Sequence, residues 1–186
     1  MQINLKNIIA LDKFASREAT RYYLNGVYVH TVGGWVYAVA TDGHRVVVHR
    51  FPNVDAVDWA FIIPSSYLGT VKFGAREDGL SDVTFDGRQI QFQHGGTRAQ
   101  VPAVDGVFPD YQRVRPVDDG EISPAQFNGQ YCADFDKLAK AFGSVAVITP
   151  RGPNPALVTF VGQDDLYGVL MPLRTDKRPF ALRAPF

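Results

Sequence analysis

The feature that most constrains the fold of this chain is an internal repeat. Three times, a short apolar strand is followed by a short helical stretch and then by three strands that tight turns separate. The spacing is roughly 60 to 70 residues, and units of this kind must pack together to bury their apolar faces. Helices this short cannot cover both faces of so many strands. The repeat therefore predicts an α+β fold with antiparallel sheets on one side and helices lining the other.

The first unit shows the pattern most clearly. Asn7 can cap a helix in which Ile8, Leu11 and Phe14 recur at helical spacing. Gly-Gly and Asp-Gly dipeptides then separate β-branched and aromatic runs, which indicates hairpins because these residues tolerate positive φ at little cost. The expected elements are a strand over residues 2–5, a helix over 7–16, and strands over 22–30, 35–40 and 45–51.

The second unit repeats this order. Pro64 ends an apolar run, Ser65 and Ser66 offer helix caps, and the same two dipeptides mark the turns. The expected elements are a strand over residues 59–63, a short helix from 65 to 73, and strands over 83–85, 88–93 and 97–104.

The third unit follows the polar, acidic segment 117–124, which is the best linker candidate. Phe135, Leu138 and Phe142 share one face of a predicted helix, and Gly143 is its expected C-terminal stop. The expected elements are a strand over residues 126–132, a helix over 134–142, and strands over 145–149, 157–161 and 166–173.

Composition limits the class of protein. A chain of 186 residues with 46% apolar content can form one large domain or two small ones in a soluble, globular protein. No segment approaches the roughly 18 apolar residues of a membrane span, and the N-terminus lacks a signal-peptide layout, so a cytoplasmic protein is expected. Nineteen basic residues balance nineteen acidic ones, which argues against tight autonomous DNA binding but leaves loose association open.

No arrangement of reactive residues indicates catalysis. The four histidines show no zinc-protease spacing, and neither a phosphate-binding loop nor a nucleophile elbow occurs. Asp42 and His44 on one turn are too few ligands to predict a metal. The lone Cys132 can form neither an internal disulfide nor a cysteine-based zinc site, and a buried thiol is expected. We therefore expect no enzyme activity, no cofactor and no metal.

Four short motifs occur in a fixed order along the three units: RYYLNG at residues 21–26, ATDGHRV at 40–46, VDGVFPDYQRV at 104–114 and VLMPLR at 169–174. With this combination the chain resembles the bacterial replicative sliding clamp, the beta subunit of DNA polymerase III. The resemblance covers most of residues 1–174 and implies a sliding-clamp fold in which two units make a domain. Residues 1–116 then resemble the family's middle domain, 122–174 the second half of its last domain, and 175–186 form a tail. The first domain and the first half of the third are not represented.

The resemblance also implies a function that is not catalytic. In this family, a groove between the middle and last domains receives short linear motifs of DNA polymerases, clamp loaders and repair proteins. Leu- and Phe-rich motifs need an apolar slot and a few hydrogen-bond donors, which the matching positions supply. The implied peptide-binding residues are Leu24, Thr41, Gly43, His44, Arg45, Val46, Pro109, Arg113, Val114, Asn128, Tyr131, Val169, Leu170, Met171, Pro172, Leu173 and Arg174.

Each motif also has a purely structural interpretation. ATDGHRV is compatible with a simple hairpin turn, VLMPLR with a final core strand that proline interrupts, and FPDY with a strand-ending turn that Asp110 caps. Taken one by one, the segments leave these alternatives open.

DNA contact is the less specific implication. A tyrosine pair matches one that touches DNA in the family, and aromatic rings stack on unpaired bases. The two tyrosines could equally be strand residues that face the core of the protein. Helix lysines and arginines could form a basic face, but nearby acids offset them, and Asp136 with Lys140 also fits a solvated helix pair. The candidate DNA-binding residues are Tyr22, Tyr23, Lys13, Arg17, Lys72, Arg76, Lys137 and Lys140, with Lys6 as a further candidate.

Three biological roles remain open at this point. A homo-oligomeric ring would surround double-stranded DNA without sequence specificity and tether a polymerase. A monomeric adaptor or decoy would bind the same motifs without encircling DNA, and a relic would have a structural role only. No membrane partner is expected. Phe180, Leu182 and Phe186 in the tail could plug the groove or form an oligomer contact, although a disordered end is favoured.

Overall fold

The computed structural model describes residues 1–54, 57–74, 77–116 and 122–174. Arg76, most of the predicted linker and the whole predicted tail lie outside these described residues. None of the helices in the described part has the length and apolar character needed to cross a membrane.

The first unit begins with β1 (Gln2–Asn4), which leads directly into α1 (Leu5–Leu11). The side chain of Asn4 caps this helix by accepting hydrogen bonds from the backbone N–H groups of Lys6 (3.0 Å) and Asn7 (3.3 Å). The predicted cap at Asn7 is therefore wrong. The amphipathic spacing is compatible with a helix that starts after Asn4 or after Asn7. The helix starts after Asn4 because the backbone of this residue is extended, as an N-cap requires. The short 3₁₀ helix η1 (Asp12–Phe14) continues the chain.

The meander of the first unit starts later than the sequence predicts. Residues Ala19–Leu24 form the 3₁₀ helix η2, so Tyr22 and Tyr23 precede the sheet and do not belong to a strand. The meander consists of β2 (Gly26–Val32), β3 (Trp35–Thr41) and β4 (Arg45–Pro52), with positive φ at the predicted turn residues Gly33, Gly34 and Gly43.

The second unit has the predicted order of elements. It contains β5 (Ala60–Pro64), α2 (Ser65–Leu68), β6 (Leu80–Phe85), β7 (Gln89–His94) and β8 (Thr97–Pro102). The helix is shorter than expected and ends at Leu68, although Val71 and Phe73 still pack against the core. A 3₁₀ helix, η3 (Tyr111–Val114), follows the unit.

The third unit lacks the strand predicted over residues 126–132. Helix α3 (Gly129–Ala141) begins inside that segment, where the Asn128 side chain accepts a hydrogen bond from the Gln130 N–H (2.9 Å). The strands β9 (Ala146–Arg151), β10 (Asn154–Phe160) and β11 (Leu166–Leu170) follow.

The sheet pairing gives the reason for this difference. The first two units exchange their first strands, because β1 pairs with β6 and β5 pairs with β2. The described part of the chain offers the third unit no companion for such an exchange. At the corresponding place, Ser123 makes a single parallel bridge with Arg151.

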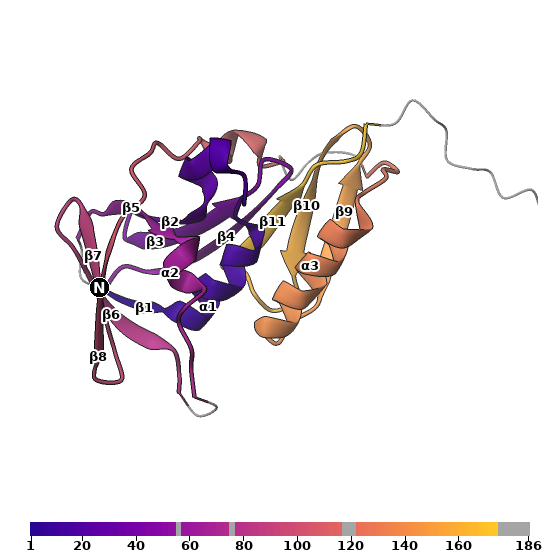
Figure 1. Cartoon of the computed structure of the whole chain (residues 1–186). Coiled ribbons are helices and arrows are strands. Elements are labelled where there is room, and N and C mark those ends of the chain that lie inside the picture. The colour runs from indigo at the N-terminus through magenta and orange to yellow at the C-terminus, as the bar shows by residue number, and fades with distance from the viewer. Residues whose placement is uncertain (55–56, 75–76, 117–121, 175–186) are drawn as a thin grey trace, which may run out of the picture.

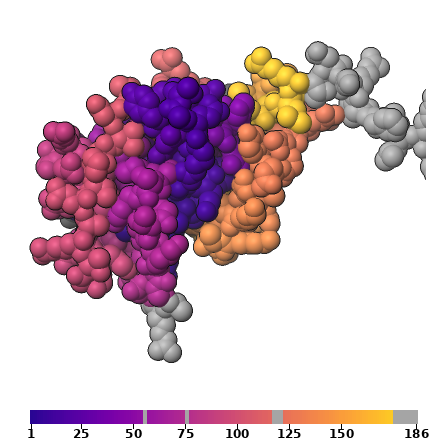
Figure 2. All heavy atoms as spheres, in the orientation of Figure 1, coloured from indigo at the N-terminus to yellow at the C-terminus, as the bar shows by residue number. Residues whose placement is uncertain are grey.

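Two antiparallel sheets result, as predicted. One has four strands in the order β1-β6-β7-β8, and the other has seven in the order β5-β2-β3-β4-β11-β10-β9 (Figure 1). The third unit joins the first through β4 and β11, where Val46 lies opposite Val169. Figure 2 shows the third unit, in orange, directly against the first unit, in indigo. The pairing of β4 with β11 therefore brings together segments more than a hundred residues apart.

The main core lies on the helix-bearing face of the seven-stranded sheet. The rings of Phe14 on η1 and Phe135 on α3 lie 4.8 Å apart, and both residues are fully buried. Because side chains alternate along a strand, Gly168 and Leu170 of β11 face these helices, whereas Val169 faces the opposite side. Cys132 of α3 is half-buried against this core.

Candidate peptide-binding groove

An apolar pocket of about 180 Å³ lies where β4, β11 and the segment after β8 meet. For comparison, an apolar cavity of about 150 Å³ holds one benzene-sized group, so this pocket has room for one leucine- or phenylalanine-sized side chain. Most of its lining residues were candidates from the sequence. The residues that line the pocket are Leu24, Thr41, Gly43, His44, Arg45, Val46, Pro109, Asp110, Tyr111, Val114, Val169 and Met171.

The floor of the pocket is made by neighbouring strands. Val46 and Val169 lie opposite each other on β4 and β11 and are almost fully buried. Together with Val39, Val48 and Tyr111 they form a small second core on the face of the sheet opposite the helices. Non-polar contacts among these five residues thus fix β4, β11 and Tyr111 relative to one another around the pocket.

A segment that we call the strap, residues 108–114, closes one side of the pocket. Its anchor is Tyr111, whose hydroxyl lies 2.9 Å from Nε2 of His30, and both side chains are buried. The ring of Phe108 stacks on Tyr28 at 4.8 Å. Burial lowers the pKa of His30 and raises the pKa of Tyr111 above its ordinary value. The neutral forms of both side chains therefore hold the strap in place at neutral pH.

Sequence reasoning did not include Tyr111 among the site residues. The FPDY motif was available, but nothing in its spacing shows that the tyrosine reaches a histidine on β2. The sequence indicates Asp110 as a cap, and its side chain accepts a hydrogen bond from the Gln112 N–H (3.2 Å) at the start of η3. Asp110 also pairs with Arg113 (2.9 Å), which is exposed and does not line the pocket.

The ATDGHRV motif forms the hairpin turn that its Asp-Gly pair predicts, and the turn also contributes to the pocket. Asp42 accepts hydrogen bonds from the backbone N–H groups of His44 (2.9 Å) and Arg45 (3.1 Å). The φ of Gly43 is 89°, a conformation that side-chain-bearing residues rarely adopt. The hydroxyl of Thr41 donates to the carbonyl of Arg45 at 2.6 Å. The structural and functional interpretations of this motif are therefore compatible.

Arg45 lines the pocket, but its guanidinium group is engaged elsewhere. Nε donates to Asp42 (3.0 Å) and Nη1 donates to Asp134 (2.8 Å), while the group lies 4.6 Å from the ring of Phe14 and 4.4 Å from that of Tyr131. Burial raises the pKa of Asp134, but its hydrogen bonds outweigh this effect and the net shift is downward. These contacts join the first and third units through the guanidinium group of Arg45.

The other sequence candidates for peptide binding do not line the pocket. Leu170 faces the helix-side core, and the N–H of Leu173 donates to the carbonyl of Gln126 at 2.7 Å. Tyr131 lies near the pocket mouth, with its ring 6.1 Å from that of His44. The candidates in this group, all outside the pocket lining, are Arg113, Asn128, Tyr131, Leu170, Pro172, Leu173 and Arg174.

Of the candidate DNA-binding residues that the structure describes, Tyr23 and Lys6 are half-buried and the others are exposed, and three of the basic ones are paired with acids. Arg17 pairs with Asp12 (2.7 Å), Lys137 with Asp134 (3.1 Å) and Lys140 with Asp136 (2.7 Å), so the helix-pair interpretation of Asp136 and Lys140 is confirmed. The rest of the set lies on separate elements. Lys13 is on η1, Lys72 follows α2, and Tyr22 and Tyr23 pack edge to face on η2.

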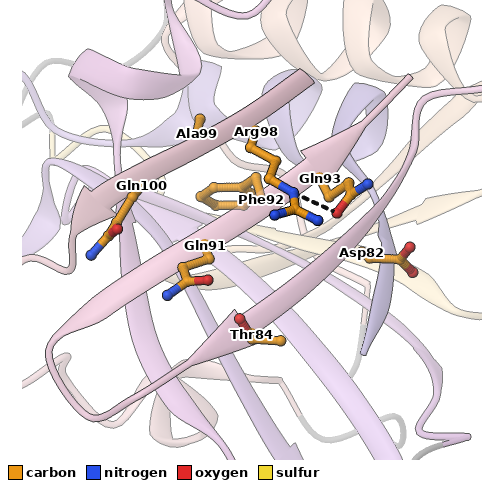
Figure 3. Close-up of a pocket in the computed structure, with 8 residues that line it drawn as sticks. All are labelled: Asp82, Thr84, Gln91, Phe92, Gln93, Arg98, Ala99 and Gln100. Atoms are coloured by element: carbon orange, nitrogen blue, oxygen red, sulfur yellow. Dashed lines mark hydrogen bonds between the residues drawn. The ribbon is translucent and has the colours of Figure 1, made fainter. Parts of the chain in front are cut away.

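A larger hollow of about 490 Å³ lies over the four-stranded sheet, and most of the residues that line it have polar side chains. Figure 3 shows Gln91, Gln93 and Arg98 on neighbouring strands, with Arg98 Nε donating to Gln93 Oε1 at 3.1 Å. None of the candidate site residues lines this hollow. Among the described residues, no group of three or more His, Cys, Asp or Glu side chains is placed to hold a metal ion.

Comparison with known proteins places this geometry in a family. The family model described as DNA polymerase III beta subunit, central domain, matches residues 1–110. The beta sliding clamp of Caulobacter vibrioides is 35% identical over 153 residues, which cover 78% of this chain, and that of Pseudomonas aeruginosa is 29% identical over 154 residues, which cover 80%. The chain spans 39% of the length of each of these relatives.

The fold agrees with this assignment. The DNA polymerase III beta chain of Streptococcus pneumoniae has a TM-score of 0.78 at 20% identity, and the match covers 94% of this chain and 64% of that one. Since the family model matches more than half of the sequence, the chain belongs to the DNA polymerase III beta subunit, or sliding clamp, family.

Proposed function

We propose that this protein is a sliding-clamp-like factor of DNA replication that binds short Leu- and Phe-rich motifs of DNA polymerases and clamp-loader proteins. The observation that carries the proposal is the apolar pocket between β4, β11 and the strap. Its walls come from segments far apart in the sequence, and its volume suits one apolar side chain of a peptide. The proposed function involves no catalytic step, and a replication factor of this kind acts in the bacterial cytoplasm.

The mouth of the pocket suits an extended peptide. Met171 and Val114 are each 37% exposed at the rim, so an incoming side chain would cover them on its way to the buried floor. Methionine is flexible and adapts to different apolar partners, which suits a site that serves several proteins. One motif buries little area, so we expect a dissociation constant in the micromolar range, about −8 kcal/mol of binding free energy.

A labelled peptide from the C-terminus of a bacterial replicative polymerase tests the proposal by fluorescence anisotropy. Met171→Asp and Val114→Asp place a charge at the rim, and each should weaken binding at least about tenfold, or about 1.4 kcal/mol. Val32→Asp is the matched control, because Val32 is an exposed valine at the end of β2 that does not line the pocket. Absence of binding by the wild-type protein at about 1 mM peptide, or equal weakening by all three variants, would contradict the proposal.

Encirclement of DNA is a separate part of the clamp function. Arg17, Lys137 and Lys140 each have an acidic partner, which argues against tight contact of these side chains with DNA phosphates. Retention of the protein on closed circular DNA, with release after linearisation, would support a ring. Peptide binding without such retention would support the monomeric adaptor.

A further inference from the structure

A further hollow, of about 760 Å³, lies along β5, the strand at one end of the seven-stranded sheet (Figure 1). It is bounded by the turn between β6 and β7 and by the segment that leads from β8 to the strap. None of the residues that line it is next to a gap in the described ranges. The described chain therefore shows this side of β5 open.

The hydrogen-bond pattern shows which part of the β5 edge is free. The N–H of Thr31 on β2 donates to the carbonyl of Trp59 at 2.9 Å, so these two residues form a hydrogen-bonded pair. Bonded and non-bonded pairs alternate along an antiparallel ladder, so Ala60 and Ile62 direct their backbone groups away from β2. The carbonyl of Ile62 accepts from the N–H of Val104 at 3.1 Å.

Three backbone groups of this stretch are left without a partner. Within the described part of the chain, nothing bonds to the N–H of Ile62 or to the N–H and carbonyl of Ala60. Ile62 is only 2% exposed and lines the hollow, so its N–H is a buried donor that needs an acceptor from elsewhere. The next outward residue, Pro64, has no N–H and ends the open stretch. A row of donor, acceptor and donor matches the backbone of one extended peptide.

The walls of the hollow suit the side chains of such a peptide. A residue opposite Phe61 would share the face of that ring, and Phe85 lies 4.9 Å from it between ring centroids. On the other face, Tyr28 lies opposite Ile62 in the sheet, and its ring stacks on Phe108 at 4.8 Å. An added strand would therefore place apolar side chains against aromatic rings on both of its faces.

The hollow and the peptide pocket share a wall. Phe108 lines the hollow, and Pro109, the next residue, lines the pocket. Val107 lines the hollow and is 90% exposed, so a chain that crosses the wall meets an apolar surface. From the sheet order, a strand added to β5 would lie roughly 22 Å from the pocket between β4 and β11. About seven extended residues span that distance.

We propose that the segment flanking the motif of a bound partner adds to β5 as a short extended strand. Its backbone bonds to Ala60 and to the N–H of Ile62, and one of its side chains packs against Phe61 and Phe85. This inference rests on the proposed function, because the partner is the protein whose motif occupies the pocket. Strand addition draws its affinity from the backbone, so the pocket selects the motif while the edge strengthens the complex.

Two labelled peptides from the C-terminus of a bacterial replicative polymerase test this inference by fluorescence anisotropy. One is the motif alone, and the other adds about 12 preceding residues, enough for the span and the added strand. The wild type should bind the longer peptide at least about fivefold more tightly. Ala60→Pro removes a free donor without removing a bond to β2, so it should bind both peptides as the wild type binds the motif alone. Ala60→Val keeps the N–H and, as the matched control, should keep the difference.

Amide exchange and chemical shifts measured by NMR test the register without a variant. The longer peptide should slow exchange of the Ala60 N–H and shift the amide resonance of Ile62, whereas the motif alone should do neither. Equal affinity of the wild type for both peptides, or an Ala60 amide left unprotected by the longer one, would overturn the inference and leave the pocket unaffected.

Two other outcomes would also decide the matter. Slow exchange of the Ala60 N–H in the protein without peptide would mean that this chain or a second copy already covers the edge, and would overturn the inference. Failure of both peptides to bind would overturn the proposed function and this inference with it.

Discussion

Arg45 Nη1 lies 2.8 Å from Asp134 Oδ2, and this ion pair joins β4 of the first unit to α3 of the third. The two side chains are only 6% and 18% exposed. Lys137 contacts the other carboxylate oxygen of Asp134 at 3.1 Å from a position that is mostly exposed. Asp134 therefore makes a buried ion pair with Arg45 and an exposed one with Lys137. Substitutions can separate the contributions of these two pairs to the free energy of unfolding.

Asp134→Ala should lower the free energy of unfolding by about 1.5–3 kcal/mol, because the buried guanidinium loses one of its two carboxylate partners while Asp42 remains. Lys137→Ala removes the exposed partner of the same carboxylate and should cost less than about 1 kcal/mol. Urea unfolding of both variants measures the difference. Equal losses would show that the buried pair has no special role in joining the units.

Gly168→Ala should destabilise the attachment of α3. A Cβ at this position would lie 2.9 Å from Cζ of Phe135 and closer still to its Cε1, and Phe135 is fully buried. We expect a loss of about 1–3 kcal/mol, because a packed core does not accommodate an extra methyl group. The double variant Gly168→Ala/Phe135→Leu should recover part of that loss. Gly129→Ala, where a Cβ meets nothing within 4 Å, is the control, and a comparable loss there would contradict the packing argument.

Tyr111→Phe should loosen the strap. The change leaves Nε2 of the buried His30 without its 2.9 Å partner, which costs about 1 kcal/mol of stability. Because the strap carries Pro109 and Val114 to the pocket, motif-peptide affinity should fall several-fold. Tyr167→Phe keeps the bond between His30 and Tyr111 and should bind peptide like wild type. Unchanged affinity of Tyr111→Phe would show that the strap does not depend on this bond.

The stability of the protein should fall between pH 7 and pH 5 because of His49. Burial lowers the pKa of His49 to about 4, while the charge of Asp165 opposes the shift. Below about pH 6.5 the unfolded chain binds a proton that the folded state does not, so stability decreases by up to about 1.4 kcal/mol per pH unit. His49→Phe, in a site beside Phe51 and Phe142, should flatten this dependence in urea unfolding at both pH values.

The control for this experiment is His44→Gln, a change on the exposed hairpin turn, which should keep the wild-type pH dependence. Some slope should persist in His49→Phe, because burial also lowers the pKa of His30. If His49→Phe kept the full wild-type dependence of stability on pH, His49 would be excluded as the source of that dependence.

The elements that sequence analysis located correctly depend on local chemistry. Alternating β-branched residues and Asp-Gly or Gly-Gly turns identified the meanders, because the conformations of those turns are set within two residues. Motif order also indicated most of the residues that line the pocket. Helices α1 and α3 both start earlier in the structure than the sequence predicts. The spacing of apolar residues shows that a helix is present, but the capping residue determines where its first turn begins.

The sequence by itself determined the repeat, the α+β class and the family, because these follow from periodicity and from motifs read along the chain. Only the tertiary structure decided that Leu170 faces the core, that Arg45 binds Asp134, and that Tyr111 anchors the strap through His30. It also decided that residues 126–132 form no strand and that α3 begins within them. Each of these facts depends on a partner far away in the sequence, and which partner is in reach is fixed only when the strands pair and their faces are buried.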